Sequence, residues 1–136
     1  MEIYAILSGK GGTGKTTLAV HFAVAAERSG QKSIVVDPDP QGSATDWGTF
    51  RQAETPVVVA ADPTRLADIL KTAEANAVDV AVIDTATHTN RDVYTRSPAQ
   101  IAASLASLVI IPCRASIFDL TEVLALYNHI QHRRKK

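Results

Sequence analysis

The chain has 136 residues, of which 46% are hydrophobic and only 5% aromatic, and its 14 basic and 14 acidic residues give a formal net charge of zero. This length predicts one domain, 1–136, with a real hydrophobic core. A neutral chain has no bulk charge for nucleic acid or a membrane surface, so any such surface must be a local patch. The single cysteine excludes an internal disulfide, and no apolar run approaches the ~18 residues that span a bilayer. We therefore expect a cytoplasmic protein without a membrane segment.

Short apolar segments alternate with helical patterns along the chain. We predict strands over 3–7, 33–36, 56–60, 78–83 and 108–111. We predict helices over about 14–29, 45–52, from 63 onward, 99–106 and 119–132, with polar loops at 37–43 and 85–98. Gly30 is expected to end the first helix, Asp62 to cap the third with Pro63 at its first position, and Asp119 to cap the last. Such alternation predicts an α/β fold in which right-handed crossovers build a mainly parallel sheet with helices on both faces.

The first predicted loop contains the pattern G-x-x-x-x-G-K-[ST], with Gly9, Gly14, Lys15 and Thr16 at its fixed positions. Glycines let the backbone turn tightly, so that its N–H groups point into an anion-sized hollow at the start of a helix. Lys15 would supply a cation for the β- and γ-phosphates and Thr16 a hydroxyl for Mg²⁺. A glycine-rich turn without a ligand does not explain why Lys15 and Thr16 open a helix. The pattern therefore predicts a nucleotide-binding site.

Acidic residues end two further predicted strands. Asp37 and Asp39 follow the second strand, and Asp84 follows the fourth. Ligands of open α/β sheets bind at the carboxyl ends of strands, so these acids are expected near the phosphate loop. Asp84 is predicted to face the Mg²⁺ ion. Asp37 and Asp39 lie two apart, so we expect different tasks, one near Mg²⁺ and the other orienting the attacking water; a rigid Asp-Pro-Asp-Pro turn is the alternative.

Two of these segments resemble a known family. The stretch from Lys10 through Gly11, Gly12, Thr13, Gly14, Lys15 and Thr16 to Thr17 resembles the deviant Walker A box of the ParA/MinD ATPases. Its mark is the extra lysine, Lys10. The segment 36–42 resembles the second motif of the ParA branch, Asp84 falls at the Walker B position, and the segment from 110 to Asp119 resembles the stretch after the fifth strand of ParA proteins.

The resemblance implies a P-loop NTPase fold, a three-layer sandwich, and an ATP-binding site with Mg²⁺. Lys10 would reach the phosphates of a second copy of the chain in a sandwich dimer. Residues 11–14 would wrap the β-phosphate, Lys15 would bind the β- and γ-phosphates, and Thr17 would lie near the α-phosphate. Asp39 would orient the attacking water. The Mg²⁺ site would be formed by Thr16, Asp37 and Asp84. ATP would then switch dimerisation on, and hydrolysis would reset it.

The resemblance also implies a role and partners. It favours a ParA-like partition ATPase that works with a ParB-like centromere-binding protein and with nonspecific DNA. Family members are much longer, so we expect an N-terminal portion that lacks the C-terminal strands and most of the adenine pocket. The basic residues 133–136 are either a DNA contact or a solvated terminus. A MinD-like membrane-cycling switch, a non-catalytic binding module and a DNA-transfer accessory protein remain alternatives.

Overall fold

Five parallel strands form the central layer of the computed structural model, which describes residues 1–87 and 97–131. In the sheet the strands follow the order β3-β2-β4-β1-β5, and every neighbouring pair is parallel. The strands are β1 (Glu2–Ile6), β2 (Ser33–Asp37), β3 (Val57–Ala60), β4 (Val80–Asp84) and β5 (Leu108–Ile110). The register pairs Ile6 with Asp84, so the loop after β1 begins beside the acidic end of β4.

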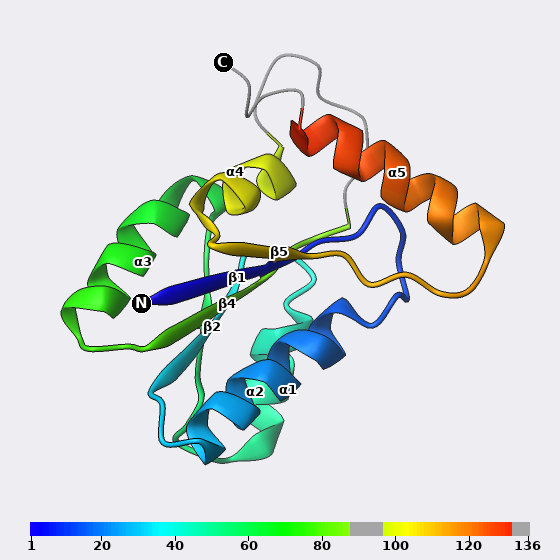
Figure 1. The fold of residues 1–136 in the computed structure, drawn as a ribbon. Coiled ribbons are helices and arrows are strands. Elements are labelled where there is room, and N and C mark those ends of the chain that lie inside the picture. The colour runs from blue at the N-terminus through cyan, green and yellow to red at the C-terminus, as the bar shows by residue number, and fades with distance from the viewer. Residues whose placement is uncertain (88–96, 132–136) are drawn as a thin grey trace.

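Helices cover both faces of the sheet (Figure 1). Helices α1 (Lys15–Arg28) and α2 (Ser43–Arg51) lie on one face. On the other face lie α3 (Leu66–Ala75), α4 (Pro98–Leu105) and α5 (Ile117–Gln131), with a 3₁₀ turn (Pro63–Arg65) before α3. The expected α/β architecture of a parallel sheet between two helical layers is confirmed.

The hydrophobic core has two parts because successive strand residues point to opposite faces. Val35 and Val82 pack toward α1 and α2, whereas Val36 and Ile83 pack toward α3, α4 and α5. All four side chains are fully buried. These apolar runs explain why β2 and β4 occupy interior positions of the sheet, where both faces need covering.

Local signals end several elements where the sequence predicts. Gly30 has a φ of 80° just after α1, and a positive φ is the conformation in which glycine carries no steric penalty. Asp62 accepts a hydrogen bond from the backbone N–H of Thr64 at 2.8 Å, and Pro63 opens the 3₁₀ turn that leads into α3. The last helix differs from the prediction: α5 begins at Ile117, and Asp119 lies inside its first turn.

The outer surface of α5 is apolar. Its exposed large side chains are Ile117, Phe118, Leu120, Leu124 and Tyr127, and Leu108 of the neighbouring edge strand β5 is also exposed. Among the helices of the described residues, none is long and apolar enough to cross a membrane. The basic segment 133–136 and most of the loop that follows Asp84 lie outside the described residues.

Candidate nucleotide-binding site

The phosphate loop joins β1 to α1 and is held in shape by one buried hydroxyl. Ser8 is 2% exposed; its Oγ accepts hydrogen bonds from the Lys10 backbone N–H at 3.0 Å and the Thr13 hydroxyl at 3.0 Å. It donates to the Lys10 carbonyl at 2.6 Å. Gly12 and Gly14 have φ angles of 71° and 88°, which residues with a Cβ adopt only under strain. The loop therefore takes a conformation that its glycines permit and Ser8 stabilises.

Lys15 is the first residue of α1 and is buried to 9% exposure. Its Nζ donates a hydrogen bond to the Thr87 hydroxyl at 3.2 Å. Burial lowers the pKa of Lys15, and the charges of Asp84 and Asp39 oppose that shift. A buried cation at the start of a helix, next to open glycine backbone, is an arrangement suited to an anionic ligand.

Asp84 ends β4 and lies against the first turn of α1. The Thr16 hydroxyl donates to Asp84 Oδ2 at 2.6 Å, and the carboxyl group is 2% exposed. Within residues 1–87 and 97–131, Asp84 Oδ1 has no hydrogen-bond partner. Burial raises the pKa of Asp84 to about 6, and the negative charges of Asp37 and Asp39 add to the rise. A buried carboxylate oxygen without a partner, beside a hydroxyl, fits an oxygen-preferring cation such as Mg²⁺.

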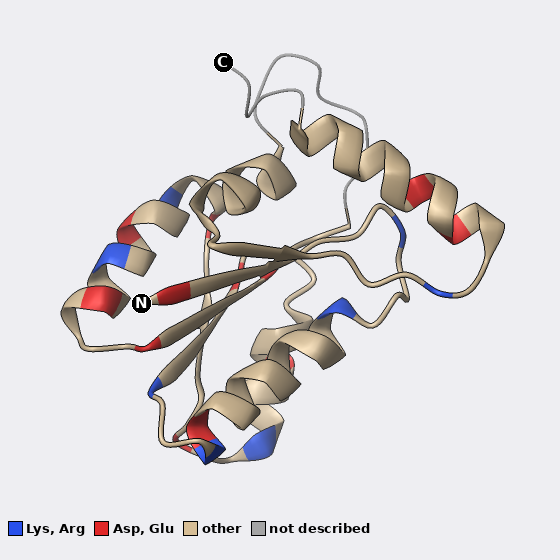
Figure 2. Ribbon diagram, viewed as in Figure 1, with Lys and Arg blue, Asp and Glu red and all other residues tan. Residues whose placement is uncertain are grey.

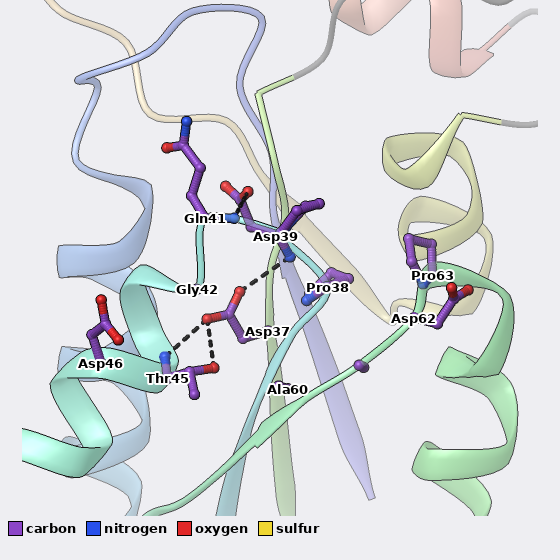
Figure 3. A pocket seen from close by; sticks show the side chains of 12 residues that line it. Asp37, Pro38, Asp39, Gln41, Gly42, Thr45, Asp46, Ala60, Asp62 and Pro63 are labelled. Atoms are coloured by element: carbon purple, nitrogen blue, oxygen red, sulfur yellow. Dashed lines mark hydrogen bonds between the residues drawn. The ribbon is translucent and has the colours of Figure 1, made fainter.

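Asp37 and Asp39 have different surroundings, as expected from their spacing (Figure 3). Asp37 is 1% exposed and points toward the start of α2, where its Oδ2 accepts from the Thr45 N–H and hydroxyl, both at 2.9 Å. Its Oδ1 accepts from the Asp39 N–H at 3.1 Å. The Asp39 side chain is half-buried, and its Oδ1 accepts from the Gln41 N–H at 2.9 Å. Asp37 thus organises the turn from which Asp39 projects.

This turn borders a cavity of about 570 Å³ at the carboxyl ends of β2 and β3. Asp37, Asp39, Asp46 and Asp62 contribute its acidic lining (Figure 3). The cavity therefore continues the acidic edge that begins at Asp84.

Lys10 extends to α5 of its own chain. Its Nζ lies 2.9 Å from Asp119 Oδ1, and Arg114 Nε lies 3.1 Å from Asp119 Oδ2. The hydrogen bond from Lys10 lowers the pKa of Asp119 more than burial raises it. Figure 2 shows basic residues on both loops beside α5 and acidic residues near the start of that helix. The carboxylate that sequence reasoning treats as a helix cap is instead an ion-pair partner.

The structure brings most of the predicted site residues to one edge of the sheet. Lys15, Thr16, Asp39 and Asp84 are coupled through contacts or electrostatic interaction. Gly11 and Thr17 are exposed beside them. The individual catalytic, nucleotide and metal roles of these residues stay predictions.

Three residues of this site have no task that the sequence predicts, namely Ser8, Thr87 and Arg114. Ser8 precedes the motif positions, and Thr87 lies in a loop with no repeated pattern. Arg114 is close to Lys10 only through the fold. Of these, only Ser8 had a local signal: a small hydroxyl residue directly before a glycine-rich turn, where Ser commonly bonds to backbone.

The family model described as CobQ/CobB/MinD/ParA nucleotide binding domain matches residues 4–134. The chain therefore belongs to this family of nucleotide-binding domains.

Individual relatives show which members of this family the chain resembles. The chain is 36% identical over 109 residues to the Maintenance of carboxysome distribution protein A of Gloeobacter kilaueensis, covering 79% of this chain and 44% of that protein. It is 31% identical over 121 residues to Protein ParA of Rhizobium radiobacter, covering 89% and 52%. The chain thus spans about half the length of these curated relatives.

A solved structure shows the same fold. A plasmid partition protein from Borrelia burgdorferi bound to AMPPNP superposes with a TM-score of 0.70 at 21% identity, covering 99% of this chain and 71% of that one. The resemblance to the ParA/MinD family is confirmed. This structure is also longer than the chain, in agreement with the expected N-terminal portion of the fold.

Proposed function

We propose that this chain is the nucleotide-binding part of a ParA-like ATPase that binds ATP with Mg²⁺, dimerises and hydrolyses ATP to partition DNA. One observation carries the proposal: at one edge of the sheet the phosphate loop, Lys15 and Thr16 meet Asp84, one oxygen of which has no partner in the part of the chain that the structure describes. The family match and the ParA relative support the nucleotide and the partition role.

The proposed reaction assigns a task to each group. The loop N–H groups and Lys15 bind the phosphates, with Thr17 near the α-phosphate, while Thr16 and Asp84 hold Mg²⁺, with Asp37 close by. Mg²⁺ supplies neutralising charge when bound. Asp39 orients the attacking water. Lys10 of a second copy adds charge to the transition state when two chains meet, as an arginine finger does in trans.

The proposed cargo is DNA, reached through nonspecific DNA contacts and a ParB-like partner. The likeness to a carboxysome distribution protein favours a second candidate, the positioning of a protein compartment. Deletion of the gene distinguishes DNA partitioning from the positioning of a protein compartment. Loss of a plasmid or chromosome at division supports DNA partitioning, whereas clustered compartments with normal DNA inheritance support the second candidate.

ATP hydrolysis by wild type, Lys15→Gln and Asp39→Ala chains tests the proposed reaction. We expect both substitutions to lower turnover by at least about a hundredfold, because each removes charge placed on the transition state or the attacking water. Unchanged turnover in Lys15→Gln would contradict the mechanism.

A mixing experiment tests the action of Lys10 in the second copy. Lys10→Ala and Asp39→Ala chains are each expected to be inactive. Their mixture forms heterodimers in which one site has Asp39 from the first variant and Lys10 from the second. We expect turnover to return in the mixture, and no recovery would contradict a lysine that acts across the dimer.

A further inference from the structure

One buried carboxylate holds two basic side chains on separate oxygens. Asp119 is 5% exposed, whereas the side chains of Lys10 and Arg114 are 50% and 58% exposed. Lys10 binds Oδ1 and Arg114 binds Oδ2, so neither basic group displaces the other. Lys10 can therefore leave without disturbing the Arg114 ion pair.

The second basic group lowers the free-energy cost of releasing Lys10 from Asp119. A buried carboxylate that loses its only cation is left uncompensated, which is strongly unfavourable. Here Arg114 Nε already lies 3.1 Å from Asp119 Oδ2, so a positive charge remains available beside the carboxylate when Lys10 moves away. Within the described residues Asp119 Oδ2 has no hydrogen-bond partner, so Arg114 compensates it through its charge. A guanidinium remains charged at any relevant pH, which suits Arg114 to this task.

Arg114 also lies close to the phosphate loop. A Cβ placed on Gly12 would lie 3.9 Å from Arg114 Nη2, so the guanidinium lies beside the phosphate loop. Gly9 is close to the next turn of α5, where a Cβ would lie 3.2 Å from Glu122 Oε2. The start of α5 and the loop before it thus bind the phosphate loop at Lys10 and lie beside it at Gly9 and Gly12.

We propose that the ion pair with Asp119 holds Lys10 within its own chain before dimerisation. Arg114 is then the positioning residue that keeps Asp119 paired when Lys10 moves to the second copy. This inference rests on the proposed function, because it assigns a resting place to the lysine that acts across the dimer. In this proposal Arg114 acts through Asp119 and not on the nucleotide itself.

Dimerisation of the whole chain with AMPPNP and Mg²⁺, followed by sedimentation, tests this inference. Asp119→Asn frees Lys10, so half-maximal dimerisation should need roughly two- to fivefold less AMPPNP, the range that a half-exposed ion pair supports. Arg114→Gln leaves Lys10 as the only cation on Asp119, so it should need roughly two- to fivefold more. Arg114→Lys should restore most of the wild-type response. The exposed Arg28, in the last turn of α1, supplies the control Arg28→Gln, which should match wild type.

The double variant separates positioning from direct nucleotide binding. If Arg114 acts through Asp119, Arg114→Gln has no further effect in the Asp119→Asn chain. A further loss in that background would show that Arg114 binds the nucleotide itself and would overturn the inference, as would single variants that match wild type. If the wild type does not dimerise with AMPPNP, the proposed function itself fails.

Amine labelling of Lys10 gives a readout that does not depend on nucleotide or on the folding of the Arg114 variant. In the nucleotide-free chain, Asp119→Asn should be acylated at Lys10 roughly two- to fivefold faster than wild type, because the ion pair no longer protects the amine. Equal labelling rates in a folded Asp119→Asn chain would overturn the inference.

Discussion

At the scale of single residues, Asp84 combines burial, a short hydrogen bond and an oxygen that has no partner among the described residues. Its pKa is raised from 3.8 to about 6, chiefly by burial. The fold therefore favours the protonated form. The contribution of protonated Asp84 to the free energy of unfolding is fully present below about pH 4 and is lost as the pH rises through 6. Near neutral pH the protein without ligand holds a charged group that burial disfavours.

Asp84→Asn should stabilise the nucleotide-free protein at pH 7, because it removes that charge while an amide oxygen can still accept from Thr16. A shift of about two pKa units corresponds to roughly 3 kcal/mol, which is the upper expected gain. The gain should vanish as the pH falls below about 3, where Asp84 is protonated in both the folded and the unfolded state. Urea denaturation at the two pH values measures both effects.

Asp68→Asn on α3 is the matched control, because that carboxylate is exposed. Its unfolding free energy should change little at either pH. An Asp84→Asn chain that is less stable than wild type at pH 7 would contradict the destabilising effect assigned to the buried charge of Asp84. In the proposed function the same substitution should also weaken Mg²⁺-dependent nucleotide binding, so stability and binding should change in opposite directions.

At the scale of elements, the contact between α2 and β3 depends on a glycine. A Cβ on Gly48 would lie 2.9 Å from Val58 Cγ2 and 3.0 Å from its Cβ. Gly48→Ala should therefore lower the unfolding free energy by about 1–3 kcal/mol through overpacking, despite the better helix propensity of alanine. The double variant Gly48→Ala, Val58→Ala should recover part of the loss in thermal denaturation. No recovery would contradict a steric origin.

Local sequence signals predict the elements well because their causes are local. Apolar runs give the strands, and Gly30 and Asp62 mark helix boundaries within a few residues. The same reasoning predicts a cap at Asp119, whereas its carboxylate binds Lys10, 109 residues away. A cap and an ion-pair partner are the same residue type in sequence, and only the packing of α5 against the phosphate loop distinguishes them.

The candidate site also has a part that the sequence predicts and a part that it does not. The phosphate loop and the strand-end acids follow from motif spacing and from the rule that parallel strands end at one edge. Neither gives the contact of Lys15 with Thr87, because that loop has no pattern that fixes its path. Nor does the spacing show that Asp37 holds its own turn through Thr45, since that requires the position of α2.

At the scale of the whole molecule, the described chain leaves an apolar surface beside the edge strand β5. Phe118 and Leu124 on α5 are 75% and 54% exposed, and Leu108 is 51% exposed. Contiguous apolar surface and an uncovered sheet edge favour association. We therefore expect the chain of 136 residues to associate with rising concentration even without nucleotide.

Polar substitution of that surface should reduce the association. Leu120→Gln with Leu124→Gln is expected to lower the sedimentation-detected oligomer fraction severalfold at equal concentration, because it interrupts the patch. Phe50→Gln on α2 is the control, since Phe50 is 82% exposed on the opposite face of the sheet. Equal reduction by Phe50→Gln would show that association does not use α5.

Calorimetric titration with ATP and Mg²⁺ tests the central claim most directly, because it measures nucleotide binding without requiring turnover or a dimer. We predict one site per chain in the wild type and at least about tenfold weaker binding in Lys15→Gln, which loses a buried charged contact to phosphate. The Lys71→Gln control, on the exposed surface of α3, should bind as wild type does. A folded wild-type chain that binds no ATP, or binds it equally well in Lys15→Gln, would contradict the account.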